Sequence, residues 1–108
     1  VNCSDAAGTE INFYTIMQML NSSSASPRMW DDNMASPFFN YKGADGTRQI
    51  WYDDVQSLRM KYEMASSLEL RGVGFWNLDT LDYSGEDPVG IADTNYMWDA
   101  VHDFFVSA

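Results

Sequence analysis

The segment that decides the fold of this 108-residue chain reads Arg-Gly-Val-Gly-Phe-Trp-Asn-Leu-Asp and occupies residues 71–79. Its centre, residues 72–76, is apolar and lacks polar–apolar alternation, a pattern typical of a strand that is covered on both faces. Apolar residues at helical spacing precede it, which gives the helix-then-strand order of a parallel α/β sheet. The segment therefore predicts a short buried strand with Trp76 at its carboxyl-terminal end.

A tryptophan in this position has two interpretations. As a binding residue, Trp76 offers a broad flat indole face on which a pyranose ring could stack. As a structural residue, it is a core aromatic, because most tryptophan side chains are largely buried for packing reasons. The exposure of the ring in the folded chain separates the two interpretations.

Several motifs accompany this segment in a fixed order along almost the whole chain. They are Cys-Ser-Asp-Ala-Ala-Gly at residues 3–8, Tyr-Thr-Ile-Met at 14–17, Asn-Ser-Ser at 21–23, Trp-Asp at 30–31, Asn-Tyr-Lys at 40–42, Trp-Tyr-Asp at 51–53, Gly-Val-Gly-Phe-Trp-Asn at 72–77 and Leu-Asp-Tyr-Ser-Gly at 81–85. Each block alone is a weak signal. Together they resemble the end of a family 18 glycoside hydrolase, and within that family the chitobiase-type enzymes.

The resemblance implies an α/β fold, namely the C-terminal part of a (β/α)₈ TIM barrel preceded by most of a small α+β insertion. A complete barrel needs at least about 200 residues, so 108 residues can hold only its last part. An absent N-terminal barrel segment is therefore an expected partner of this chain.

Residues 1–52 are expected to form the insertion subdomain. Apolar side chains at helical spacing within residues 8–20 predict a short helix. Three aromatic-rich pieces follow, at residues 28–32, 37–41 and 48–52. An Asp-Gly pair at residues 45–46 is a hairpin signal between the second and third pieces. The pattern predicts an antiparallel meander.

Residues 53–108 are expected to form the last barrel units: a helix, the strand ending at Trp76, an acidic loop over residues 79–93 and a C-terminal helix. Asp53 or Asp54 can cap the first helix, and Gln56 completes a capping box with Asp53. Thr94 is expected to cap the last helix. The side chains predicted to face inward are Leu58, Tyr62, Ala65 and Leu68 or Glu69 on the first helix, and Met97, Val101, Phe104 and Phe105 on the last.

The function that the resemblance implies is cleavage of N-acetylglucosamine linkages in the chitobiose core of N-linked glycans or in chitooligosaccharides. In such enzymes the reaction retains configuration and the substrate's acetamide assists, an exception to the usual two-carboxylate scheme. Trp76 would stack under the sugar beside the scissile bond. The alternative is a non-catalytic secreted protein, carbohydrate-binding or structural, derived from the same fold.

No catalytic residue is expected in this chain. The family's catalytic signature, DxxDxDxE, is expected upstream, at the end of the fourth barrel strand. Asp79, Asp82, Ser84 and Glu86 imitate its spacing, but serine replaces the aspartate that orients the substrate acetamide. The isolated chain is therefore expected to be inactive.

Charge and composition exclude several classes of partner. The formal net charge of −10 and an isoelectric point near 4.1 disfavour nucleic acid and anionic membranes. A hydrophobic share of 45% favours a packed domain over disorder. His102 is a lone histidine, so neither a metal site nor a cofactor is expected.

Two sequons and one cysteine favour a lysosomal or secreted protein. Asn2 and Asn21 each begin an Asn-X-Ser sequence and are possible glycosylation sites. Cys3 is the single cysteine, which is expected either to form a disulfide with a partner upstream of this chain or to be a free thiol.

Overall fold

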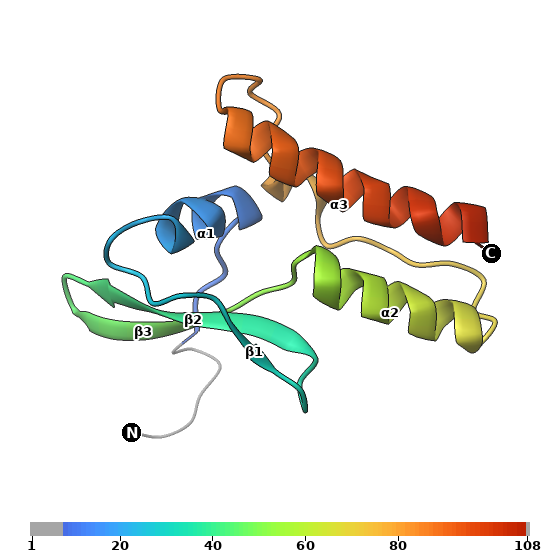
Figure 1. Cartoon of the computed structure of the whole chain (residues 1–108), viewed down its shortest axis with the longest axis horizontal. Coiled ribbons are helices and arrows are strands. Elements are labelled where there is room, and N and C mark those ends of the chain that lie inside the picture. Colours follow the sequence, from blue (N-terminus) through green and yellow to red (C-terminus); the bar gives the residue numbers. More distant parts are fainter. Residues whose placement is uncertain (1–7, 108) are drawn as a thin grey trace.

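The computed structural model describes residues 8–107. This part of the chain contains, in order, α1 (Phe13–Leu20), β1 (Met29–Asp31), β2 (Ser36–Gly43), β3 (Gly46–Trp51), α2 (Val55–Ser67), the 3₁₀ turn η2 (Leu78–Thr80) and α3 (Pro88–Ser107). Figure 1 shows two halves, with α1 over the sheet on one side and α2 beside α3 on the other. The described fold is α+β, and no parallel sheet is formed within it.

The strands form an antiparallel sheet in the order β1-β2-β3, so the predicted meander is confirmed. β2 and β3 are joined by a two-residue loop, because Gly43 pairs with Gly46. Gly46 has φ +120°, a conformation that side-chain-bearing residues rarely adopt. The Asp-Gly pair therefore predicted the position of the hairpin correctly, and its glycine, Gly46, is the first residue of β3.

One core cluster joins the sheet to α1. Phe39 and Ile50 are paired across β2 and β3, so both side chains lie on the same face of the sheet. They pack with Ile16 of α1 and with Tyr52, whose ring meets that of Phe39 edge-on at a centroid distance of 5.9 Å. The predicted helix within residues 8–20 is confirmed, although its first turn begins only at Phe13.

A second cluster joins α2 to α3. Its buried members are Tyr62, Ala65, Ala100, Val101 and Phe104. Spacings of three and four residues bring the members within each helix to one face, as predicted. Two predictions are wrong. Neither Leu68 nor Glu69 is buried, because both lie beyond Ser67, the last residue of α2, and Phe105 is 61% exposed, because its neighbour Phe104 is the residue that faces the cluster.

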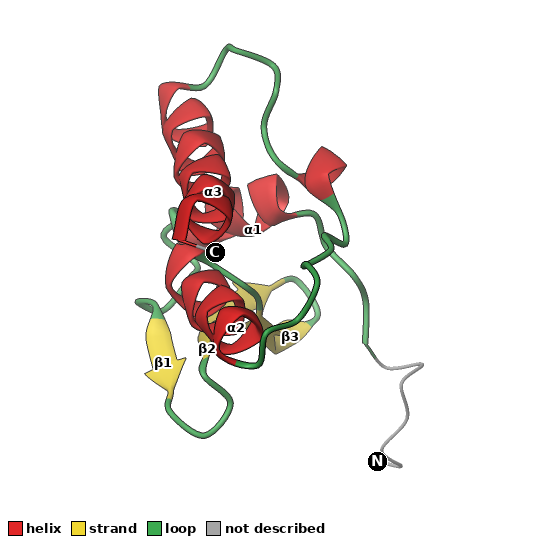
Figure 2. Cartoon of the chain, turned by 90° about the vertical axis from the view of Figure 1, so that its right-hand side faces the viewer, coloured by secondary structure: helices red, strands yellow, loops and turns green. Residues whose placement is uncertain are grey.

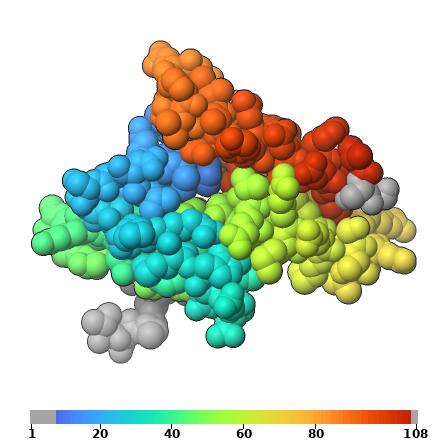
Figure 3. Space-filling model, viewed as in Figure 1, coloured from blue at the N-terminus to red at the C-terminus, as the bar shows by residue number. Residues whose placement is uncertain are grey.

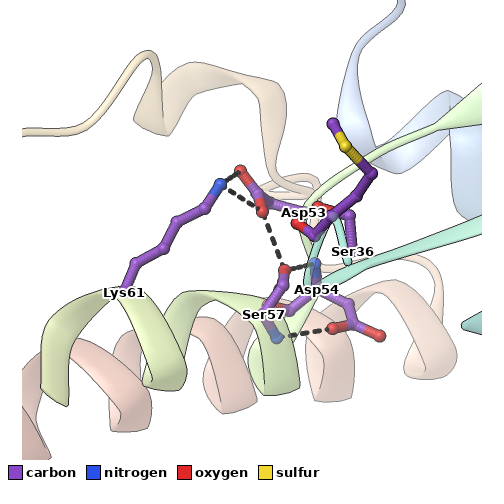
Figure 4. A network of polar contacts seen from close by, with 6 residues as sticks. Ser36, Asp53, Asp54, Ser57 and Lys61 are labelled. Atoms are coloured by element: carbon purple, nitrogen blue, oxygen red, sulfur yellow. Dashed lines mark hydrogen bonds and ion pairs between the residues drawn. The ribbon is translucent and has the colours of Figure 1, made fainter. Parts of the chain in front are cut away.

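The start of α2 is held by a polar network of four side chains (Figure 4). Asp54 Oδ1 accepts from the backbone N–H of Ser57 at 3.0 Å, and the N–H of Asp54 donates to Ser57 Oγ at 2.9 Å. Asp53 instead accepts from Lys61 Nζ at 2.7 Å. The capping box is therefore formed by Asp54 and Ser57, and its prediction for Asp53 and Gln56 was wrong by one residue.

Asp54→Ala should lower the free energy of unfolding by about 1 kcal/mol, within the usual range for a lost helix cap. The change also removes the carboxylate that pairs with Arg28 at 2.8 Å. Asp45→Ala is the matched control, because the Asp45–Arg48 pair is exposed and such pairs contribute little. Urea denaturation checks this expectation, and equal losses in the two variants would contradict it.

The strand predicted for residues 72–76 is not formed. These residues have no β-ladder partner among residues 8–107. A strand needs a neighbouring backbone to satisfy its N–H and C=O groups, and the described chain offers none beside this segment. The placement of the second half in a barrel accordingly remains a proposal.

The last helix begins at Pro88, seven residues earlier than a cap at Thr94 would place its first residue. Asp87 Oδ1 accepts from the N–H of Val89 at 3.0 Å, and proline suits the first helical position because it lacks an N–H. Thr94 lies inside α3, buried, where its Oγ1 donates to the carbonyl of Asp82 at 3.0 Å. Thr94 therefore ties the preceding loop to α3 and does not cap the helix.

Candidate functional site

A groove of about 1590 Å³ opens between the two halves of the molecule. Its walls come from residues 8–12 and α1, from β3, which is an edge strand of the sheet, from α2 and α3, and from residues 73–78 and 80–81. Figure 2 shows the loop before η2 passing along α2 on the side toward β3. Figure 3, seen from the same side as Figure 1, shows the sheet and α2 in direct contact on this face of the molecule.

Trp76 stands at the end of the extended segment and lines this groove. Its residue exposure is 93%, while Val73 and Phe75 pack against the α2–α3 cluster. Phe75 meets the Tyr62 ring edge-on at 6.3 Å, which anchors the segment just before Trp76. The peptide bond that follows Trp76 is cis. Within the described chain Trp76 is thus not a core residue, and the sugar-stacking role stays a prediction.

The groove contains a buried polar atom without a partner. The Tyr62 hydroxyl has no hydrogen-bond partner among residues 8–107, although Tyr62 is only 6% exposed. Burial raises the pKa of this hydroxyl, and the nearby Asp53 carboxylate raises it further. Buried polar groups are nearly always hydrogen-bonded in complete folds. Tyr62 therefore marks a place where a further group is needed.

The cationic side chains of the groove are neutralised within it. Lys61 Nζ lies 2.7 Å from Asp53, and an Arg48 guanidinium nitrogen lies 3.2 Å from Asp45. Glu10 is a further acidic residue in the lining. The groove thus carries no excess positive charge and is poorly suited to phosphate or sulfate groups.

The four residues that imitate a catalytic signature do not gather at the groove. Asp79 and Glu86 are exposed, Asp82 is buried, and none of these three belongs to the lining. Asp82 packs against Gly90, where any Cβ would collide with its carboxylate. Ser84 Oγ accepts from the N–H of Glu86 at 3.2 Å. The arrangement is that of a turn preceding α3.

A small pocket of about 230 Å³ lies between α1 and the start of α3, and it is lined by Tyr14, Asp87 and Asp93 among others. Burial raises the pKa of the Asp93 carboxyl, and Asp87 raises it further. The pKa of Tyr14 is raised as well, by desolvation first and then by Asp82, Asp87 and Glu86. Burial therefore disfavours the charged forms of Tyr14 and Asp93 where these two helices meet.

Asp93→Asn should stabilise the chain at neutral pH. Folding raises the pKa of the Asp93 carboxyl above its unfolded value of about 3.9. The contribution of this group to the free energy of unfolding is therefore fully present below the unfolded pKa and is lost as the pH rises through the folded pKa. The melting temperature should therefore rise more at pH 7 than at pH 4. Asp99→Asn removes the same charge from an exposed position of α3, and an equal gain in that variant would contradict the expectation.

The remaining candidate residues are spread over the surface. Asn21 is exposed at the C-terminal end of α1, so a glycan could be carried there. His102 is exposed on α3. Asn2 and Cys3 lie outside the described residues. Among residues 8–107 no three histidine, cysteine or acidic side chains gather as a metal site would require. No helix in that part is long and apolar enough to cross a membrane.

Sequence reasoning missed two features of the groove. The unpartnered Tyr62 hydroxyl was predicted only as part of an apolar stripe, and spacing gives no information on the partner of a hydroxyl. For Trp51 the sequence left two interpretations, packing within the meander, which was favoured, and lining the substrate cleft; the residue stacks on Phe38, and it is also 42% exposed and lines the groove. Its place at the end of an edge strand was the available signal.

Sequence comparison with known proteins shows that the chain is homologous to a portion of chitobiase-type glycosidases. Human di-N-acetylchitobiase is 43% identical over 100 residues, which is 92% of this chain and 26% of that protein. The probable di-N-acetylchitobiase 2 of Dictyostelium discoideum is 39% identical over 96% of this chain and 27% of its own length. Rat di-N-acetylchitobiase is 39% identical over 92% of this chain and 27% of its own length.

These matches confirm the resemblance to chitobiase-type enzymes. The chain spans about a quarter of the length of these relatives. No protein-family model matches the sequence.

Proposed function

We propose that this chain is the C-terminal portion of a family 18, chitobiase-type glycosidase, and that it supplies one wall of the substrate cleft. The observation that carries the proposal is Trp76, whose 93% exposed side chain lines a groove in a chain homologous to chitobiases. A solvent-exposed indole face can stack against the apolar face of a pyranose ring. The substrates are N-acetylglucosamine linkages of the chitobiose core or of chitooligosaccharides.

Chemistry and binding are divided between two parts of the polypeptide. The N-terminal barrel segment, which precedes this portion, supplies the glutamic acid that protonates the leaving group and the aspartate that orients the substrate acetamide. The acetamide attacks the anomeric carbon, so configuration is retained. The present chain positions the sugar, because Trp76 stacks under the ring beside the scissile bond.

Two features support a missing neighbour on the groove side. Within the described chain, residues 72–76 have no β-ladder partner and the buried Tyr62 hydroxyl has no hydrogen-bond partner. The absent barrel segment pairs its strands with residues 72–76 and so forms the sheet that the sequence predicted. The same segment brings a polar group to Tyr62.

A lysosomal or secretory location is part of the proposal. Exposed Asn21 can carry an N-linked glycan, and Asn2 is a second acceptor. Cys3, which lies outside the described residues, is expected to form a disulfide with the upstream segment or to be a free thiol. Burial raises the pKa of the Asp93 carboxyl, so the stability that this one group contributes is lost as the pH rises through its folded pKa.

The 108-residue chain alone should hydrolyse no chitooligosaccharide, because its sequence contains no complete DxxDxDxE signature. A fluorogenic N-acetylglucosaminide offered to the purified chain tests this, with a heat-denatured sample as baseline. Turnover above baseline that disappears in Glu86→Gln would show that residues 79–86 are catalytic after all. The intact mass of the native protein distinguishes the two functional hypotheses. A portion of an enzyme should carry about 200 further residues upstream of Val1, whereas a free-standing binding protein should not.

A further inference from the structure

We propose that Trp51 is a second sugar-binding platform, which holds another pyranose of the same oligosaccharide along the edge of β3. The inference rests on the proposed function, because its ligand is the N-acetylglucosamine oligomer that Trp76 binds. Trp51 and Trp76 line one groove although they come from different halves of the fold.

The Trp51 ring is held rigidly and is still open to solvent. One of its faces stacks on Phe38, with ring centroids 4.5 Å apart and planes inclined by 16°. Its Nε1–H donates to Gln49 Oε1 at 2.8 Å, which fixes the rotation of the ring in its plane. The residue is nevertheless 42% exposed. A flat aromatic surface fixed from behind loses little entropy when a sugar stacks on it.

Polar groups accompany this ring. Trp51 pairs with Phe38, and Gln49 pairs with Asn40, so all four side chains lie on one face of the sheet. The Gln49 amide donates to Asn40 Oδ1 at 3.5 Å. An aromatic plane flanked by side-chain amides offers both stacking and hydrogen bonds to hydroxyl or acetamide groups.

The charges of the groove favour a neutral ligand. Its two cations, Arg48 and Lys61, are each paired with an aspartate. An anionic polymer would find no free cation among the described lining residues, whereas a neutral oligosaccharide meets no electrostatic penalty. A groove of about 1590 Å³ also exceeds the roughly 300–1,000 Å³ of common small-ligand pockets, which leaves room for more than one sugar ring.

The four tryptophan indole N–H signals of the ¹⁵N-labelled chain test the inference in one titration with tetra-N-acetylchitotetraose. The signals of Trp51 and Trp76 should shift together with one saturation curve. Trp30 is the internal reference, because it does not line the groove and its ring lies under the Arg28 guanidinium. Trp51→Leu should weaken binding roughly three- to tenfold, as expected for one lost aromatic stack. Trp51→Phe should restore part of the loss, and Trp30→Leu should leave the affinity unchanged.

The possible outcomes separate this inference from the proposed function. If only the Trp76 signal shifts, and the Trp51 signal stays unchanged like that of Trp30, the second platform is overturned and the proposed function stands. A shift of Trp51 alone would support the platform and contradict the role of Trp76. Absence of both shifts would contradict the two proposals together.

Discussion

Trp76→Ala should lower kcat/KM on a chitobiose-type substrate by about 2 to 3 kcal/mol, or roughly 30- to 150-fold, in a chimera that carries this chain in place of the matching portion of human di-N-acetylchitobiase. The estimate takes one face of an indole, about half of its 150 to 250 Å², at about 25 cal/mol per Å². Because Trp76 is 93% exposed, the melting temperature should change little.

Measurement of kinetics and melting temperature on the same preparation separates binding from folding. Trp76→Phe is the matched variant, since it keeps an aromatic face and should retain part of the activity. A lowered melting temperature with unchanged kcat/KM in the folded fraction would show that Trp76 is a structural residue in the assembled protein.

Phe104→Ala should cost about 3 to 5 kcal/mol of unfolding free energy, as for other large-to-small changes in a core. Phe104 is 7% exposed and packs with Tyr62 at a ring-centroid distance of 5.9 Å between α2 and α3. A loss of this size is comparable with the whole stability of a marginal domain. The variant should be largely unfolded at 37 °C.

The neighbouring residue provides the control for this prediction. Phe105 is 61% exposed and touches Phe104 edge-on at 5.4 Å. Phe105→Ala should therefore cost only about 1 kcal/mol or less. Circular dichroism during thermal unfolding compares the two variants, and similar midpoints would contradict the orientation of α3 described above.

The first half of the fold could be predicted from local patterns. The aromatic-rich pieces and the Asp-Gly turn are local signals, and the structure forms the meander that they indicate. The start of α3 was also encoded locally, by Asp87 and Pro88, but Thr94 offered a competing cap signal. Burial of Thr94 against Asp82 is a tertiary contact, and the sequence pattern does not reveal it.

The second half depends on groups that local patterns cannot supply. The apolar run at residues 72–76 predicted a covered strand, but a strand forms only where another backbone lies beside it. The site shows the same dependence. Trp76 was identified as a candidate from its position, while for Trp51 the available signal was its place at the end of an edge strand, and its 42% exposure was recognised in the structure.

The activity of the unmutated chimera tests the central claim most directly. If this chain is the cleft wall of a chitobiase-type enzyme, the folded chimera should hydrolyse a chitobiose-type substrate with kcat/KM within about tenfold of the human parent, since the parent supplies the acid and this chain supplies Trp76. A chimera that folds with the parent's melting behaviour but shows no turnover would contradict the account.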